Sequence, residues 1–153
     1  MKQKEMDNID VLLLQELVAD SRQSLRSISR KLGIAVSTAS SRLERLKGSG
    51  MIKGFSAEID HEKMGYSLTA IITIRTRQAY TEEVEKAIAD MKNSTAVYSV
   101  AGSFDAIVVA KFKNRNEMRA FIRDILKLEK VQRTETHIVM GTFKEKAGNW
   151  ALA

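Results

Sequence analysis

The chain of 153 residues contains no cysteine, no proline, only two histidines and few aromatic residues. Without cysteine, neither a disulfide nor a thiolate metal site can form. No run of about 18 apolar residues occurs, which argues against a transmembrane helix. The N-terminal segment MKQKEMDNID lacks the apolar core of a signal peptide. We therefore expect a cytoplasmic protein that has no contact with a membrane.

The residue patterns that catalytic sites need are also missing. His61 and His137 are the only histidines, and neither has a metal-ligand spacing such as H-x-x-x-H. There is no Ser/His/Asp motif, and Gly48 and Gly50 end a helical pattern instead of opening one, as a phosphate-binding loop would. The sequence therefore predicts no enzyme, no cofactor and no metal site.

The chain does have ample apolar sequence and an excess of positive charge. Hydrophobic residues make up 44% of it, enough for a folded core, and the formal net charge is +6. Residues 1–54 hold ten Lys and Arg against six Asp and Glu, whereas the rest of the chain holds 15 against 13. The basic excess is thus concentrated in the N-terminal third, which favours an anionic partner for that part.

Helical periodicity dominates this basic region. Helices are predicted from about Asp7, a candidate cap, to Ala19, from Ser24 or Leu25 onward, and from about Ser37, a candidate N-cap, to Lys47. Gly33 lies where a helix-turn-helix needs a permissive turn residue. Residues 1–53 are therefore predicted to form a (winged) helix-turn-helix domain. Phe55–Ile59 alternates like a short wing or linker strand, within a linker over residues 54–65.

The third predicted helix separates an apolar side from a polar side. The residues expected to point inward are Val36, Ala39, Leu43 and Leu46. The residues expected to face the DNA major groove are Thr38, Ser41, Arg42 and Arg45, since Arg can donate two hydrogen bonds to guanine. Contacts to phosphate are expected from Ser24, Arg26 and Ser37. For each residue alone, a solvated helix face is the alternative.

The remaining residues, 66–153, show β-strand patterns that alternate with helical ones. Strands are predicted at Leu68–Arg75, Val97–Ala101, Ala106–Phe112 and about Arg133–Phe143, with helices opening at Thr81 and at Asn114 or Asn116. This order is the ferredoxin-like βαββαβ arrangement, an antiparallel sheet with two helices on one face, so the fold class is α+β. Because Ala106–Phe112 is apolar apart from Lys111, the other face of the sheet needs a cover, and a second copy of the domain is the economical choice.

Several short motifs follow one another along residues 7 to 146. They are Asp7-x-x-Asp10, Ile28-Ser29-x-x-Leu32-Gly33-Ile34, Ser41-Arg42-Leu43-x-x-Leu46-x-x-x-Gly50-x-Ile52, Gly65-Tyr66, Ala101-Gly102-x-x-Asp105 and Arg133-Thr134-x-Thr136-x-Ile138-Val139. As an ordered set they resemble the Lrp/AsnC (leucine-responsive, or feast/famine) family of transcriptional regulators. The resemblance implies an N-terminal helix-turn-helix and a C-terminal effector-binding and oligomerisation domain. It also implies dimers formed through the sheet face, often assembled into tetramers or octamers.

The chain departs from the family pattern at its turns. Family members often have a capping serine where this chain has Ala35, so we expect the cap at Ser37. Prolines common in the family near Ala35-Val36 and Asp60-His61 are absent. These differences loosen turns without removing any chemistry.

The resemblance also implies an effector pocket between dimers, lined by the loop before the third strand and by the last strand. The expected site residues are Ala101, Gly102, Ser103, Asp105, Thr134 and Thr136. Gly102 would let backbone amides approach a ligand, Asp105 would bind an α-ammonium group, and the two threonines would present hydroxyls on one face of a strand. The residues alone favour a tight turn in which Asp105 caps backbone amides.

The sequence therefore predicts a sequence-specific regulator that binds double-stranded DNA as a homodimer or a larger homo-oligomer. Its oligomeric state and DNA affinity would be tuned by a small effector, an amino acid by the resemblance. The alternative is an architectural, chromatin-like protein that coats DNA without an effector, through the same basic surface.

Overall fold

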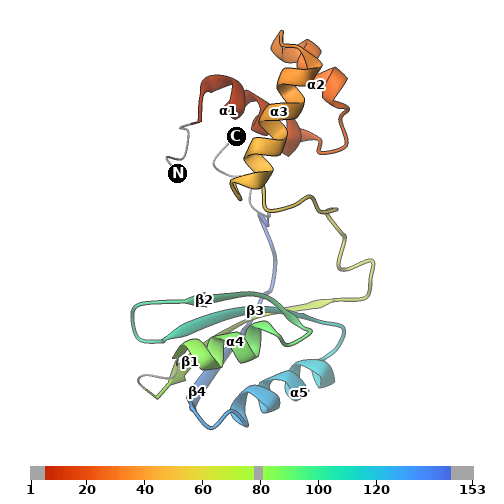
Figure 1. Cartoon of the computed structure of the whole chain (residues 1–153). Coiled ribbons are helices and arrows are strands. Elements are labelled where there is room, and N and C mark those ends of the chain that lie inside the picture. The colour runs from red at the N-terminus through yellow and green to blue at the C-terminus, as the bar shows by residue number, and fades with distance from the viewer. Residues whose placement is uncertain (1–5, 78–80, 146–153) are drawn as a thin grey trace. The chain divides into compact units, whose positions relative to one another are not determined.

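The computed structural model describes residues 6–77 and 81–145, and the chain divides into two compact units between Glu58 and Ile59. The division falls inside the predicted linker. The first unit is helical, and the second contains a sheet with two helices (Figure 1). No helix in the described part of the chain is both long enough and apolar enough to cross a membrane.

The first unit contains α1 (Asn8–Ala19), α2 (Leu25–Leu32) and α3 (Val36–Gly48). Asp7 caps α1 as predicted, in a reciprocal arrangement: its carboxylate accepts from Asp10 N at 3.0 Å, and Asp10 accepts from Asp7 N at 3.1 Å. Ser24 caps α2 by accepting from Ser27 N at 3.2 Å. Local side-chain chemistry therefore sets the starts of both helices.

The turn between α2 and α3 contains Gly33, as predicted, but the start of α3 differs from the predicted one. Gly33 ends α2 with φ +65°, a left-handed conformation that costs glycine little. α3 then begins at Val36, with Ala35 in the N-cap position and no side-chain cap, so the predicted cap at Ser37 is wrong. The short turn brings Ala35 O to Ala39 N at 3.0 Å, which leaves Ser37 inside the first helical turn. Val36 was predicted to point inward, but its side chain is 44% exposed. The first buried residue of α3 is Ala39, three residues further on.

A small core joins the three helices. Its buried members are Leu13, Leu14 and Leu17 of α1, Ile28 of α2 and Leu46 of α3. Leu32, Leu43 and Ile52 pack against them, half-buried. The same apolar periodicity that predicted the helices therefore supplies this core.

The predicted strand Phe55–Ile59 does not form. Residues 53–60 adopt no regular secondary structure, and the side chains of Phe55 and Ile59 are 53% and 48% exposed. The alternating pattern is real, but a strand needs a neighbouring strand to bind its backbone groups. Within the described chain the sheet begins only at Leu68.

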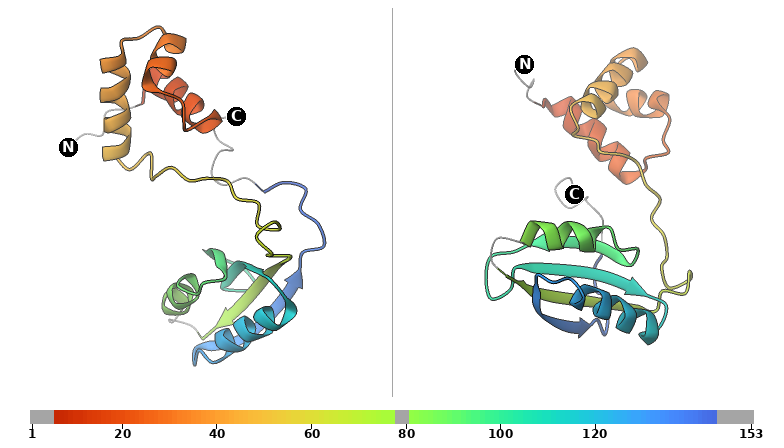
Figure 2. Two further views of the ribbon diagram at one scale, coloured as in Figure 1. Left: turned by 90° about the vertical axis from the view of Figure 1, so that its right-hand side faces the viewer. Right: turned by 60° about the horizontal axis from the view of Figure 1, so that its bottom comes forward.

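The second unit has the predicted βαββαβ order. Its elements are β1 (Leu68–Thr76), α4 (Thr81–Ala89), β2 (Ser94–Ser99), β3 (Ala106–Phe112), α5 (Arg115–Leu126) and β4 (Val131–Ile138). The strand order is β2-β3-β1-β4, and every neighbouring pair is antiparallel, which confirms the ferredoxin-like fold (Figure 2). Asn114 caps α5, so the first of the two predicted starts, Asn114 and Asn116, is confirmed.

Two strands end elsewhere than predicted. β2 begins at Ser94, three residues early, because Ser94 pairs with Ala110 and its hydroxyl donates to Ile88 O at 2.6 Å. β4 stops at Ile138, well before Phe143. It pairs only with β1, and the last β1 residue opposite it is Ala70, two residues after β1 begins. Strand ends thus follow the neighbouring strand more closely than the local sequence.

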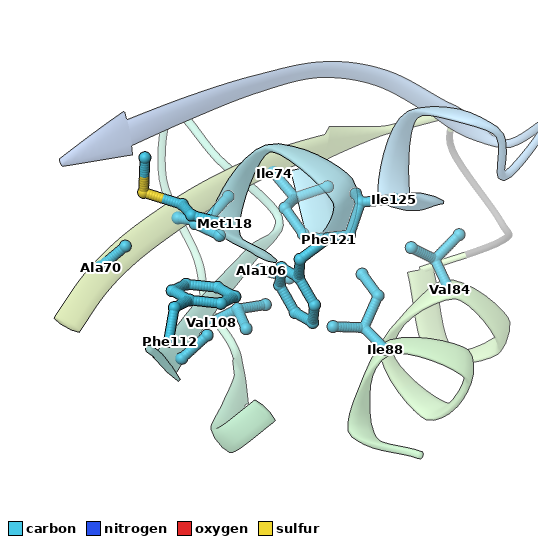
Figure 3. Packing of buried hydrophobic residues seen from close by; sticks show 12 residues of the cluster. Ala70, Ile74, Val84, Ile88, Ala106, Val108, Phe112, Met118, Phe121 and Ile125 are labelled. Carbon is cyan, nitrogen blue, oxygen red and sulfur yellow. The ribbon is translucent and has the colours of Figure 1, made fainter. Parts of the chain in front are cut away.

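One face of the sheet packs against both helices. Ala70, Ile72 and Ile74 of β1 and alternate residues of β3 meet Val84 and Ile88 of α4 and Met118, Phe121 and Ile125 of α5 (Figure 3). The rings of Phe112 and Phe121 meet edge to face, with centroids 5.2 Å apart. Neither helix of the second unit therefore covers the opposite face of the sheet.

That opposite face, here called the open face, carries Ile71, Thr73, Tyr98, Ile107 and Val109. Cross-strand pairing places them together: Ile71 opposite Val109, and Ile107 opposite both Thr73 and Tyr98. Ile71 is 37% and Tyr98 56% exposed. Thr73 is buried, yet its hydroxyl has no hydrogen-bond partner among the described residues.

Candidate functional site

The solvent-facing side of α3 carries small hydroxyl groups, the carboxylate of Glu44 and the ammonium group of Lys47. Ser37, Ser41 and Glu44 are exposed and follow one another at spacings of four and three residues, which places them on one side of the helix. Ala39 and Leu46 are buried on the opposite side. The Ser41 hydroxyl donates to Thr38 O at 3.0 Å, and Glu44 forms an ion pair with Lys47 at 2.9 Å. Thr38 lies at the edge of this face, half-buried.

Arg42 and Arg45 do not lie free on that side. Arg42 Nη1 donates to both carboxylate oxygens of Asp7 at 2.7 Å and to Asp10 Oδ1 at 2.8 Å. Arg45 Nη2 donates to Asp10 Oδ2 at 2.6 Å. These four residues are here called the acid–arginine cluster. Because the first turn of α1 lies beside the middle of α3, tertiary packing gives both arginines intramolecular partners.

Asp10 is the buried centre of the cluster, with a side chain 0% exposed. Burial raises the pKa of Asp10, but hydrogen bonds from Arg45, Arg42 and the backbone N–H of Asp7 outweigh it and lower the pKa to about 2. The hydrogen bond from Arg42 lowers the pKa of Asp7, and the same bond raises the pKa of Arg42. Two carboxylates and two guanidinium groups thus cancel in charge.

Cations without such partners lie on α2 and just before it. Arg26 and Arg30, four residues apart on α2, are exposed, and so is Arg22. None of the ion pairs found among the described residues involves these three arginines. By contrast, Lys31 on the same helix donates to Glu16 and to Gln23. Arg22 and Arg30 were not in the predicted site. Arg30 could have been included, because it is four residues after Arg26 and therefore lies on the same side of α2.

The predicted effector loop is tied to the end of β1. Asp105 Oδ2 accepts from Thr76 N at 2.7 Å and from the Thr76 hydroxyl at 3.3 Å, and Asp105 N donates to Ile74 O at 2.9 Å. This is the turn-capping arrangement that the residues alone favoured. Ala101, Gly102 and Ser103 are exposed above it. Gly102 has φ +153°, a conformation that other residues rarely adopt.

The two threonines of β4 lie across β1 from this loop. Thr134 pairs with Ile74 and Thr136 with Ile72, so their side chains share the face of the sheet that the helices cover, and both are half-buried. The loop and the threonines are therefore at the same end of the sheet but separated by a strand. Arg75, which was not predicted, donates to Ser103 O and so joins the loop to β1. Among the described residues, no cluster of acidic or histidine side chains could hold a metal ion.

A helix-turn-helix unit with an exposed third helix, joined to a ferredoxin-like unit, defines the architecture of a DNA-binding transcriptional regulator. Residues 6–53 match the family model for winged helix-turn-helix DNA-binding domains, and residues 69–148 match the Lrp/AsnC ligand binding domain. The chain belongs to the Lrp/AsnC family of transcriptional regulators, and it is not an enzyme.

Individual relatives agree with this assignment. An uncharacterized HTH-type transcriptional regulator of Pyrococcus furiosus is 41% identical over 141 residues, which cover 92% of this chain and 95% of that protein. The HTH-type transcriptional regulator FL11 of Pyrococcus horikoshii is 36% identical over 140 residues, covering 92% and 93%.

Solved structures share the whole architecture. The leucine response regulatory protein of Mycobacterium tuberculosis has a TM-score of 0.81 and 28% identity, over 92% of this chain and 96% of that one. A transcriptional regulator of Neisseria meningitidis, crystallised as a complex with L-Met, has a TM-score of 0.87 at 22% identity, over 97% and 100%. At 22% identity, the similarity to the Neisseria meningitidis regulator shows a shared fold only.

Proposed function

We propose that this regulator binds double-stranded DNA sequence-specifically through α3, as a homodimer joined by the open face, and that a small effector tunes its assembly and DNA affinity. The observation that carries the proposal is the exposed side of α3, where Ser37 and Ser41 stand free of the core, together with the exposed arginines of α2. Hydroxyl groups and arginines are suited to base edges and phosphates.

The proposed DNA contacts divide between the two helices. Ser37, Thr38 and Ser41 would meet bases or phosphates in the major groove, and Ser24 and Arg26 would contact the backbone. The N-terminus of α3 supports this arrangement, because Ala35 offers no side-chain cap and leaves first-turn amides for a phosphate. Arg42 and Arg45, with side chains 21% and 32% exposed, are already bound by Asp7 and Asp10, so they are not among the proposed phosphate contacts.

The open face supports the proposed dimer. Its exposed apolar side chains, Ile71 and Tyr98, would be buried against a second copy, and the unpaired hydroxyl of Thr73 would gain a partner there. A two-fold dimer would address two half-sites about 34–36 Å apart, or a multiple of that distance, so we expect roughly palindromic sites. Further assembly to a tetramer or octamer is part of the proposal.

The effector part of the proposal rests on the loop from Ala101 to Asp105. Its exposed backbone at Gly102 allows close approach of a ligand, and Asp105, Thr134 and Thr136 supply polar groups at the same end of the sheet. The match to the Lrp/AsnC ligand binding domain spans all of these residues. We propose an amino acid as the effector, because Asp105 would suit an α-ammonium group. A second copy would complete the site.

DNA recognition is tested by footprinting followed by mobility-shift titration against unrelated competitor DNA. A Ser37→Ala, Ser41→Ala double variant should lose about 0.5–1.5 kcal/mol of discrimination per hydrogen bond to a base that is removed. Ser56→Ala, an exposed serine outside the helices, is the control. If unrelated DNA competes as well as the footprinted site for the wild-type protein, sequence specificity is refuted and the architectural alternative is favoured.

The effector is tested separately by a thermal-shift screen against the amino acids. A ligand that binds only the folded protein raises Tm in proportion to the logarithm of its concentration above Kd. No shift with any amino acid at millimolar concentration would remove the effector from the proposal and leave DNA binding in place.

A further inference from the structure

The acid–arginine cluster changes what α3 presents to DNA. Arg42 and Arg45 are the two guanidinium groups of the helix, and both are bound by carboxylates of the same unit. The exposed side chains that remain on the helix are those of Val36, Ser37 and Ser41 and the ion pair of Glu44 with Lys47. The positive charges of the two arginines of α3 are thus balanced by the carboxylates of Asp7 and Asp10.

The carboxylates occupy the guanidinium groups in the way that a phosphate would. Carboxylate and phosphate oxygens are the two acceptors that arginine binds through short, charge-assisted hydrogen bonds. The bonds from Arg42 to Asp7 and from Arg45 to Asp10, at 2.7 and 2.6 Å, have that length. Asp10 is fully buried, whereas the side chain of Asp7 is 47% exposed, so Asp7 is the carboxylate partner of Arg42 that a DNA phosphate could replace.

We propose that Asp7 and Asp10 are specificity-determining residues of DNA recognition. By binding Arg42 and Arg45 they withhold two guanidinium groups from the phosphate backbone, so that α3 meets DNA through Ser37, Ser41 and Glu44. The inference rests on the proposed DNA binding through α3.

The consequence concerns selectivity more than affinity. Phosphate contacts strengthen binding to every sequence alike, because they depend on charge and on the counterions that the charge releases. Base contacts distinguish one sequence from another. Withholding two arginines therefore weakens binding to unrelated DNA and raises the ratio between the specific and the unrelated site. The phosphate contacts that remain come from arginines outside the cluster, such as Arg26.

The experiment is a salt titration of DNA binding by the full-length Asp7→Asn variant, with the footprinted site and with unrelated DNA as probes. Asparagine caps helices as well as aspartate does, so the start of α1 is kept while one charge partner of Arg42 is removed. We expect several-fold tighter binding to unrelated DNA. The slope of log K against log salt should steepen by about one for each arginine that reaches a phosphate.

Three further variants make the result specific. Glu58→Gln removes the same charge from the first unit at an exposed position outside the cluster, and it should leave the salt slope unchanged. Adding Arg42→Gln to Asp7→Asn should return the slope to that of the wild-type protein. Arg42→Gln alone should leave it unchanged, because this arginine is withheld in the wild-type protein.

Three results would overturn the inference. They are an unchanged or shallower slope for a folded Asp7→Asn variant, the same gain from Glu58→Gln, or a slope reduced by Arg42→Gln alone. The proposed function fails differently: the wild-type protein would then not distinguish the footprinted site from unrelated DNA. An Asp7→Asn variant with unchanged salt slope in a protein that does discriminate refutes only the role of the carboxylates.

Discussion

Arg45 donates a hydrogen bond to the buried carboxylate of Asp10 at 2.6 Å, which links the middle of α3 to the first turn of α1. Two helices that are 35 residues apart at this contact are thus held by a charged pair whose acid has no access to solvent. Breaking such a pair from one side leaves an uncompensated buried charge, which is strongly destabilising. The orientation of α3, the helix proposed to bind DNA, therefore depends on α1.

Acid should weaken this link. The pKa of Asp10 falls from 3.8 to about 2 on folding. A depressed carboxyl pKa stabilises the fold above the unfolded value and loses that contribution as the pH falls through the folded value. We expect the free energy of unfolding to drop by about 2 kcal/mol between roughly pH 5 and pH 1 from this group. Urea unfolding across that range, with NMR titration of the Asp10 carboxyl carbon, measures it.

The variant Asp10→Asn provides the control for the acid experiment. It should be less stable than the wild-type protein at neutral pH and should lack this part of the pH dependence. An Asp10 carboxyl that titrates near 4 in the folded protein would contradict the prediction.

The exposed arginines of α2 should account for much of the salt dependence of DNA binding. Arg26→Ala and Arg30→Ala should each weaken binding to all sequences about equally and reduce the magnitude of the salt slope by about one. Lys31→Ala is the matched control on the same helix, because Lys31 is already bound to Glu16. Equal effects of all three substitutions would show that the intramolecular pair of Lys31 has no influence.

A charge placed on the open face should disrupt the proposed dimer. Ile71→Glu puts a carboxylate beside Val109, in the middle of that face, where a second copy would have to bury it. Light scattering should then report a monomer, with weaker binding to palindromic DNA. Leu126→Glu makes the same change at an exposed apolar residue of α5, on the other side of the sheet, and should leave the mass unchanged. Identical masses for Ile71→Glu and the wild-type protein would refute the open face as the dimer interface.

Asp105 offers a way to separate its structural role from ligand binding. Asp105→Ala removes the acceptor for Thr76 N and should lower stability by about 1–3 kcal/mol. Asp105→Asn keeps a neutral acceptor, so it should be closer to the wild-type protein in Tm yet lose affinity for any ligand bound through an ammonium group. Isothermal titration calorimetry, with the amino acid identified in the thermal-shift screen, measures the affinity of each variant for that ligand. Undiminished affinity in Asp105→Asn would remove Asp105 from the effector site.

Much of the fold could be predicted from periodicity and local chemistry. The cap at Asp7, the helix starts near Ser24 and Asn114 and the strand Ala106–Phe112 were predicted correctly, because each depends on side chains within a few residues. The ends of β2 and β4 and the supposed strand at Phe55–Ile59 were not. Their pairing depends on distant segments, which a local pattern does not contain.

By itself, the sequence determined the order of the elements, the family and the polar character of α3, because hydrophobic spacing and helix-start chemistry are local properties. Only the tertiary structure decided which of those polar side chains are available. Arg42 was expected opposite the core, but the first turn of α1 lies beside it and supplies Asp7 and Asp10 as partners. Likewise, the carboxylate of Asp105 accepts a hydrogen bond from the backbone N–H of Thr76 at the end of β1. Both cases have the same physical reason: a charged group binds the nearest well-placed opposite charge or donor, and the fold decides which one that is.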